Sequence, residues 1–421
     1  MTRLVSAGHG GIDLEGRLDG IPESKSTIEL NPYILTECDG RYYLGKIAFA
    51  GKDKEVDGKA RLVLDESKKD FSEFHAFDDK SSLDDYLTQT GIGEGDVTRV
   101  TTEVALGQGA LNAAFGMAVF GRSVSKEVID IYLATIFESK AVKKKLPKEL
   151  RSNGRYKGAG DGQIITNMNI KGFSHRLTLR APAEEYDDFG NRNGVLEKLT
   201  KKDGILIDSV KDKGYAARLY RTLKATKPHV YISATDSMLK SLGADRVKKL
   251  LGECEVYIAQ VKEMESLLNY KGEITRNNPA ELMDAMLKIK SMMKNEGKNA
   301  RVYVTDNERG SYVLDSKDNL YYHPIIKGIP VVNTNGCGDG FAAVATYLQL
   351  LRTTTRQDYS SSDILFHASI AGQIKAGLPT ACGEDMATLQ KIDDFYNAYP
   401  QSRSVTKLTP KYKKVRRVGG R

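Results

Sequence analysis

Short apolar runs alternate with longer stretches of helical periodicity in the second half of the chain. The runs GILIDSV (204–210), HVYISAT (229–235) and EVYIAQV (255–261) are rich in β-branched residues. Each precedes apolar positions three and four residues apart, which are typical of an amphipathic helix. Strand and helix in alternation indicate βαβ units, whose strands lie parallel. We therefore expect an α/β fold with a central, mostly parallel sheet, and a ligand site at the carboxyl ends of its strands.

The first half of the chain carries other patterns. Residues 41–65 and 163–182 alternate apolar and polar positions, which predicts antiparallel strands with one face toward solvent. Residues 110–145 have apolar side chains at three- and four-residue spacing, and we expect helix throughout this stretch. One large α/β domain with a smaller attached element is the expected organisation.

Composition narrows the class of protein. Hydrophobic residues at 40% and charged residues at 28% are typical of a folded globular chain. The 4 cysteines show neither zinc-ligand spacing nor a disulfide framework, which suits a reducing compartment. We find no signal-peptide pattern and no run near the roughly 18 apolar residues of a membrane span. We therefore expect a cytoplasmic protein with no membrane partner.

Most of the net charge of +8 lies at the end of the chain. The last fifteen residues, KLTPKYKKVRRVGGR, hold seven basic side chains and no acidic one, so the rest of the chain carries only +1. Such a tail can bind a polyanion, but a solvated terminus is the more frequent case. We therefore do not expect a nucleic-acid partner.

The strongest chemical signal is a glycine-rich turn between the apolar run Ile329–Val332 and the helix-like stretch FAAVATYLQLL. The turn consists of Asn333, Thr334, Asn335, Gly336, Cys337, Gly338, Asp339 and Gly340. Its successive main-chain N–H groups can point at one spot, where the helix start adds partial positive charge. This predicts an anion hole suited to a transferring phosphoryl group. Asp339 beside it can take the proton of an attacking hydroxyl.

A tight turn with Asp339 as a helix cap is the alternative interpretation. The length of the string and the small-residue helix behind it favour the anion hole. A second G-A-G-D-G string, Gly158–Gly162, lacks a strand before it and a helix after it, so we interpret that string as a simple turn.

The string 333–340 resembles the D-T-x-G-A-G-D signature of ribokinase-like (PfkB) carbohydrate and nucleoside kinases. Asn333 stands in place of the first Asp and Cys337 in place of Ala. The form N-T-N-G-x-G-D-G is especially similar to inosine-guanosine kinases, and T-N-G-x-G-D also to adenosine kinases. The residues that this resemblance implies are the catalytic base Asp339, the anion-hole residues Gly336, Cys337 and Gly338, and the nucleotide-binding residues Asn333 and Thr334.

Weaker likenesses follow in the family's order along the chain. Residues 10–13 are similar to G-x-x-x-D, 107–114 to G-G-x-x-x-N-x-A, 260–263 to N-x-x-E and 305–310 to T-x-G-x-x-G. By this resemblance Asp13, Gly107, Gly109 and Asn112 bind substrate, Glu263 and Gln260 lie around the metal, mostly in its outer sphere, and Thr305, Asn307 and Gly310 bind nucleotide. Asn307 replaces a Gly, and Asn tolerates positive φ better than most residues. On residue type alone, Asp13 in a turn and Glu263 at an exposed helix start remain equal alternatives.

The resemblance implies a three-layer ribokinase-like fold in which a small β-sheet lid covers the substrate. The expected domain spans 1–402, with lid strands from about 14–65 and 163–182, and a basic tail spans 403–421. ATP and Mg²⁺ are the implied cofactors, and the reaction would move the γ-phosphoryl group to a hydroxyl, expected to be a primary alcohol, of a sugar or nucleoside.

Two further expectations concern partners. Exposed lid edges can pair two copies into a homodimer. The alternative function is a catalytically silent scaffold or regulator of the same fold that binds a polyanion through its tail. The departures at Gln108, Gln260, Asn307 and Asn333 motivate this alternative.

Overall fold

The computed structural model describes most of residues 2–409, and in 11–24, 101–107 and 163–180 it describes the backbone alone. The residues outside the description are 1, 9–10, 19–20, 25–26, 39, 50–51, 64–68, 108, 125–128, 136–145, 148–149, 151–155, 158–162, 171–175, 181–195, 271–273, 275–277, 298, 356, 379–385, 401–403 and 410–421.

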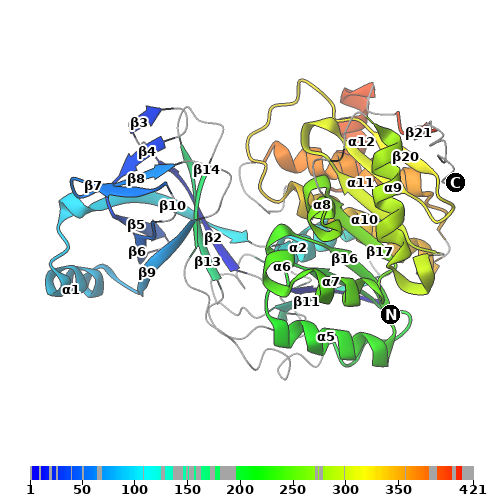
Figure 1. The fold of residues 1–421 in the computed structure, drawn as a ribbon, viewed down its shortest axis with the longest axis horizontal. Helices are drawn as coiled ribbons and strands as arrows, with labels where there is room; N and C mark the ends of the chain where they lie inside the picture. The colour runs from blue at the N-terminus through cyan, green and yellow to red at the C-terminus, as the bar shows by residue number, and fades with distance from the viewer. Residues whose placement is uncertain are drawn as a thin grey trace, which may run out of the picture.

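A ten-stranded sheet forms the centre of the larger domain (Figure 1). In spatial order its strands are β12 (Tyr156–Lys157), β11 (Ile129–Thr135), β1 (Thr2–Gly8), β15 (Gly204–Asp208), β16 (His229–Ser233), β17 (Val256–Gln260), β18 (Arg301–Thr305), β19 (Ser311–Leu314), β20 (Leu320–His323) and β21 (Thr406–Leu408). The strands from β12 to β18 are parallel, and the last three are antiparallel. The expected mostly parallel sheet is therefore confirmed.

Helices cover both faces of this sheet (Figure 1). One layer contains α2 (Gly109–Val124), α10 (Cys337–Thr355), α11 (Ser361–Ala376) and α12 (Leu389–Ala398). The other contains α5 (Lys213–Thr226), α6 (Asp236–Leu242), α7 (Ala244–Leu251), α8 (Val261–Leu268) and α9 (Pro279–Ser291). Successive strand residues point to opposite faces, so Tyr231 joins the first core while Val230 and Ile232 join the second. The three-layer α/β architecture is confirmed.

The expected helix over 110–145 is confirmed up to Val124 and wrong for Ile129–Thr135, while 125–128 and 136–145 lie outside the described residues. Helix α2 ends at Val124, and Ile129–Thr135 forms β11, which pairs with β1. Ile131 and Leu133 are buried in the core, as a central strand requires. A short apolar run fits a buried strand or a buried helix equally well, and only pairing in the sheet decides between them.

The apolar run before the glycine-rich turn is also not a strand. Residues 329–334 have no regular secondary structure, and Val331 and Val332 are 63% and 58% exposed. Instead of pairing in the sheet, the N–H groups of Val332 and Asn333 donate to Ala376 O at the end of α11. Residues 406–408 lie in the sheet, although they belong to the segment 403–421 that the sequence predicts as a tail.

A smaller, mostly β-stranded structure, which we call the β unit, lies beside the sheet (Figure 1). Its closed barrel is formed by β10 (Val97–Gly107), β2 (Gly11–Leu18), β13 (Gln163–Ile170), β14 (Arg176–Arg180), β9 (Lys69–Phe77), β6 (Arg41–Ile47) and β5 (Tyr33–Cys38). A four-stranded sheet adds β3 (Ile21–Ser24), β4 (Thr27–Leu30), β8 (Lys59–Val63) and β7 (Lys54–Val56), and the helix is α1 (Lys80–Thr90).

The β unit is larger than the strands that alternation predicts. Strands in 41–65 and 163–182 are confirmed, but β9, α1 and the start of β10 lie in residues 66–100, whose charged composition hides them. Buried side chains from Ile34, Ile47, Leu62 and Phe71 form a core of its own between the barrel and the four-stranded sheet. The unit is joined where β1 ends at Gly8 and β2 begins at Gly11, at the carboxyl edge of the central sheet.

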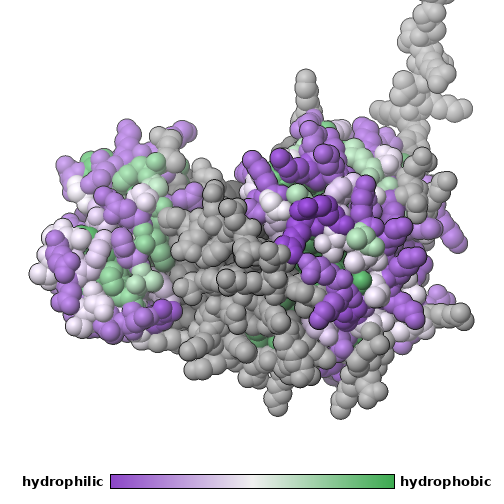
Figure 2. All heavy atoms as spheres, turned by 90° about the horizontal axis from the view of Figure 1, so that it is seen from below, coloured by the Kyte–Doolittle hydropathy of each residue, from purple (hydrophilic) through white to green (hydrophobic). Residues whose placement is uncertain are grey.

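Polar side chains cover most of the described surface of the larger domain in the view of Figure 2. Among the described residues, no helix combines the length and apolar character that crossing a bilayer requires.

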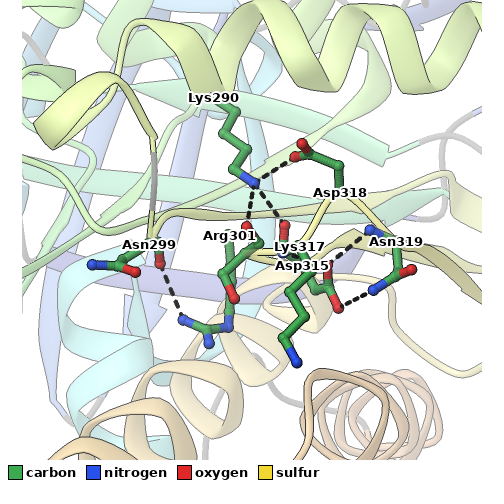
Figure 3. Close-up of polar contacts among 8 residues, drawn as sticks. Lys290, Asn299, Arg301, Asp315, Lys317, Asp318 and Asn319 are labelled. Carbon is green, nitrogen blue, oxygen red and sulfur yellow. Dashed lines mark hydrogen bonds and ion pairs between the residues drawn. The ribbon is translucent and has the colours of Figure 1, made fainter.

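A buried lysine fastens α9 to the turn between β19 and β20 (Figure 3). Lys290 Nζ donates to the carbonyl oxygens of Asp315 at 2.8 Å and Ser316 at 3.1 Å, and to the carboxylate of Asp318 at 2.6 Å. The Asp315 carboxylate in turn accepts the main-chain N–H groups of Lys317 and Asn319. The turn is therefore tied to α9 through this cation.

We expect Lys290→Met to lower the free energy of unfolding by about 1–3 kcal/mol, because it removes the ammonium that donates to two carbonyl oxygens and to the Asp318 carboxylate. Urea unfolding followed by circular dichroism measures the change. Lys288→Met, on the exposed side of the same helix, is the control and should change little. Equal unfolding midpoints for both variants would contradict this role of Lys290.

Candidate functional site

Four neighbouring parallel strands end in polar residues at one edge of the sheet. Strands β15, β16, β17 and β18 end at Asp208, Ser233, Gln260 and Thr305. Asp208 lies opposite Ser233 in the pairing, and Gln260 lies opposite Thr305. Parallel strands bring these ends together, so the edge is where the sequence predicts a ligand site.

Asp208 is a fully buried carboxylate at this edge. Ser209, with φ of 52°, donates its hydroxyl to Asp208 Oδ1 at 2.5 Å, while Oδ2 has no hydrogen-bond partner among the described residues. Burial, followed by the charge of nearby Asp339, raises the pKa of Asp208 to about 7. Sequence reasoning missed this residue, although an Asp that ends an apolar strand is the signal that could have found it.

The start of α2 approaches Asp208 closely. A Cβ atom at Gly109 would lie 1.9 Å from Asp208 Oδ1 and 2.7 Å from the Ser209 hydroxyl. Only glycine fits there, so the predicted site residue Gly109 is required first by this protein contact. The amino end of α2 consequently faces a buried carboxylate.

Asn112 lies one turn further along α2 and is 3% exposed. Its Nδ2 donates to Asp339 Oδ2 at 2.7 Å, although the two residues are 227 positions apart. Its Oδ1 is buried without a hydrogen-bond partner among the described residues. Asn112 therefore orients Asp339 and keeps an acceptor for a further donor.

The glycine-rich turn leads directly into α10. Gly336 has φ of 74°, and its carbonyl accepts the N–H of Gly340 at 2.8 Å. In the part of the chain that the structure describes, the N–H groups of Gly336 and Gly338 have no acceptor, whereas Cys337 N–H donates to Thr334 O at 3.4 Å. Two of the three amides expected in the anion hole are thus available, and the third makes a long turn contact.

Glu263 lies in the first turn of α8, with its side chain folded back on the sheet edge. Its carboxylate accepts the main-chain N–H of Gln260 at 2.8 Å and of Asp236 at 3.1 Å. Burial raises the pKa of Glu263 to about 8. The two N–H groups lower this pKa, and the negative charges of Asp208 and Asp236 raise it further. The side chain of Gln260 is exposed beside it.

The turn after β18 contains two residues with positive φ. Asn307 has φ of 47°, as expected for an Asn in place of Gly, and Gly310 has φ of 106°. A Cβ at Gly310 would lie 2.3 Å from His323 O. Thr305 ends β18 in register with Gln260, which places this turn at the same edge.

The remaining predicted residues are described in part or not at all. Asp13 lies in β2 between Ala105 of β10 and Ile165 of β13, and Gly107 pairs with Gly11; the Asp13 side chain is outside the described part. Residues 108 and 158–162, the second G-A-G-D-G string included, also lie outside it.

The site gathers negative charge that calls for a cation. Asp208 and Glu263 both have a raised pKa, and Asp208 Oδ2 is a buried acceptor with no donor among the described residues. A hard divalent cation such as Mg²⁺ suits carboxylate oxygens. Within the described ranges, no three His, Cys, Asp or Glu side chains form a ready metal cluster. These carboxylates therefore fit Mg²⁺ that keeps several of its waters.

A family model described as pfkB family carbohydrate kinase matches residues 195–389. The matched segment holds β15 to β20, the turn at 333–340, and helices α10 and α11. Residues 195–389, somewhat less than half of the 421-residue chain, thus match the PfkB family. The resemblance carried by the glycine-rich turn is thereby confirmed.

Solved structures of a phosphofructokinase and of nucleoside kinases share the fold over most of the chain. Phosphofructokinase-2 from Escherichia coli, in complex with substrates and products, has a TM-score of 0.56 at 12% identity, covering 94% of this chain and 98% of that chain. A nucleoside kinase from Methanocaldococcus jannaschii has 0.54 at 10%, covering 94% and 99%. Adenosine kinase from Sinorhizobium meliloti has 0.52 at 13%, covering 94% and 99%. No curated protein matches in sequence. At these identities the structures show the ribokinase-like fold.

Proposed function

We propose that this protein is an ATP-dependent kinase that transfers the γ-phosphoryl group to a hydroxyl, a primary alcohol, of a sugar or nucleoside. The observation that carries the proposal is the carboxylate of Asp339 at the amino end of α10, held by Asn112 at 2.7 Å. The amides of Gly336 and Gly338, which have no acceptor among the described residues, lie in the same turn. A base next to an anion hole is what phosphoryl transfer to an alcohol needs.

The reaction uses Asp339 as the proton acceptor. The acceptor oxygen forms a bond to the γ-phosphorus while the bond from that phosphorus to the bridging oxygen breaks and ADP leaves. The hydroxyl proton passes to the Asp339 carboxylate. Asn112 holds that carboxylate in place, so little reorganisation is needed when the proton moves.

The amides of Gly336 and Gly338 receive the charge of the transferring phosphoryl oxygens. Helix α10 begins at Cys337, and its first-turn N–H groups add positive potential at the same point. The long contact from Cys337 N–H to Thr334 O can be exchanged for a phosphoryl oxygen at small cost, because a 3.4 Å bond is weak.

Asp208 and Glu263 would hold Mg²⁺, with Gln260 at the rim. The ion would neutralise the β- and γ-phosphates when bound. The turn Thr305–Gly310 and the residues Asn333 and Thr334 would contact the nucleotide.

The β unit would close over the acceptor. Asp13 and Gly107 lie in its strands β2 and β10, which pair with each other, and Gly107 comes shortly before Gly109, which contacts Asp208. Closure would exclude water, which otherwise competes as the phosphoryl acceptor. A silent scaffold is the less favoured function, because the Gly-x-Gly-Asp centre is complete.

A panel of acceptors tests this proposal. We expect ADP release that requires both Mg²⁺ and one of ribose, fructose, fructose phosphate, adenosine, inosine or guanosine. The form of the turn favours one of the nucleosides. Purified protein that binds ATP·Mg but releases no acceptor-dependent ADP across sugars, sugar phosphates and nucleosides would contradict the proposal.

A further inference from the structure

Helix α11 packs its last turn directly against the segment that precedes the anion hole. The N–H groups of Val332 and Asn333 both donate to Ala376 O, at 2.8 and 3.0 Å. A Cβ at Gly372 would lie 3.2 Å from Cys337 O, so α11 packs tightly against the first turn of α10. The shape of the phosphoryl site is therefore tied to α11.

Lys375 lies in that last turn and is fully buried. Its Nζ donates toward Asn333 O at 3.5 Å. Its Cβ is 3.6 Å from the position that a Cβ on Gly340 would take, and Gly340 follows Asp339 in α10. Taking an ammonium group out of water costs several kcal/mol, so a lysine at this place is expected to have a function that a neutral side chain cannot supply.

Asn333 is held from three sides by these contacts. Its N–H donates to Ala376, its carbonyl faces the Lys375 ammonium, and its Oδ1 accepts the N–H of Asn335 at 2.8 Å. The last bond forms the turn that leads to Gly336. The orientation of the Gly336 and Gly338 amides thus depends on Asn333, and Asn333 depends on α11.

We propose that Lys375 is a positioning residue for phosphoryl transfer, a fixed cation that holds the Asn333 carbonyl and adds positive charge behind the anion hole. This inference rests on the proposed kinase function. A positive charge in a low-dielectric surrounding acts strongly on a nearby anionic transition state. The ammonium is built into the chain, so it is present before ATP binds and needs no reorganisation.

Lys375→Met tests the charge with a side chain of similar length. We expect kcat to fall at least tenfold with the KM of the acceptor unchanged, and the Kd for ATP·Mg measured by calorimetry to rise at least tenfold. Lys375→Gln keeps a donor for Asn333 O without the charge, and is also expected to lose turnover. If Lys375→Met does not fold, the kcat and the Kd for ATP·Mg of Lys375→Gln test the role of Lys375 instead.

Lys375→Ala adds a chemical test, since it leaves space where the ammonium stood. We expect propylammonium to restore part of the lost kcat in this variant and to leave the wild type unaffected. Lys290→Met is the matched control, a buried lysine that also binds carbonyl oxygens but lies away from the site. It should lose stability and keep its kcat.

Three results separate the possible failures. Folded Lys375→Met and Lys375→Gln with wild-type kcat and wild-type Kd for ATP·Mg would overturn the role of Lys375 and leave the kinase function standing. A loss in Lys375→Met that Lys375→Gln does not share would overturn the role of the charge. Wild-type protein that transfers no phosphoryl group would contradict the proposed function itself. The role of Lys375 would then be tested only by comparing the Kd for ATP·Mg between the wild type and the Lys375 variants.

Discussion

Asp339→Asn is expected to lower kcat by about 10²–10⁴-fold, the usual contribution of a general base. The amide oxygen of the new side chain can still accept the hydrogen bond from Asn112, so the local structure should persist. The KM values for ATP and acceptor should change little, because the variant removes only proton acceptance. Steady-state ADP release with the best acceptor of the panel measures the loss.

Asp245→Asn is the control for this prediction. Asp245 is also an aspartate in the first turn of a helix, α7, but it is exposed on the surface. It should keep wild-type kcat, and thermal melts should show both variants folded. A folded Asp339→Asn variant with kcat within threefold of the wild type would remove Asp339 from the mechanism.

Asp208→Asn is expected to stabilise the metal-free protein at high pH. The same substitution is expected to lower the affinity of the protein for Mg²⁺. Burial and the charge of Asp339 raise the pKa of Asp208 to about 7, whereas the unfolded chain loses this proton near its ordinary value of 3.8. The stability that Asp208 contributes is therefore greatest below about pH 4 and is lost as the pH rises through 7. A neutral Asn avoids this loss, so the variant's advantage should grow from pH 4 to pH 8.

Urea unfolding in EDTA at several pH values measures this effect. Added Mg²⁺ should stabilise the wild type at pH 8 more than Asp208→Asn, and the variant should need more Mg²⁺ for half-maximal activity. If the variant were less stable than the wild type in EDTA at pH 8, the raised pKa of Asp208 would be contradicted.

Asp203 provides a control of opposite sign. Burial alone would raise its pKa, but hydrogen bonds from Arg3 and Thr200 lower the pKa of Asp203 below its ordinary value. The stability from Asp203 is present above the unfolded pKa and is lost as the pH falls. Asp203→Asn should therefore be destabilising at pH 8, with a difference that shrinks in acid.

The two halves of the chain differ in how far their sequence predicts their structure. The βαβ succession after residue 204 follows from apolar periodicity, since each strand and helix there is set by neighbours in the chain. The same periodicity misassigned Ile129–Thr135, which is a strand only because β1 is available to pair with it. The closed barrel is likewise decided by pairing, because β5 and β10 meet in parallel across a long connection.

The candidate site divides in the same way. The chemistry of 333–340 is local: consecutive glycines, one carboxylate and a following helix define an anion site wherever the turn lies. The positive φ of Asn307 is local as well. Which carboxylates share the site is not local, and Asp208 escaped notice because a single Asp after a strand is common.

By itself, the sequence determined the parallel α/β fold and one turn able to bind a phosphoryl group. The spacing of apolar residues and the run of glycines set the local structure of only a few neighbouring residues, so they can be read directly from the chain. Tertiary structure alone decided that Asn112 reaches Asp339, that Gly109 gives room to Asp208 and that Lys375 is buried against Asn333. These contacts join residues 42 to 227 positions apart. Only the packing of whole helices on the sheet brings such distant residues within hydrogen-bonding distance.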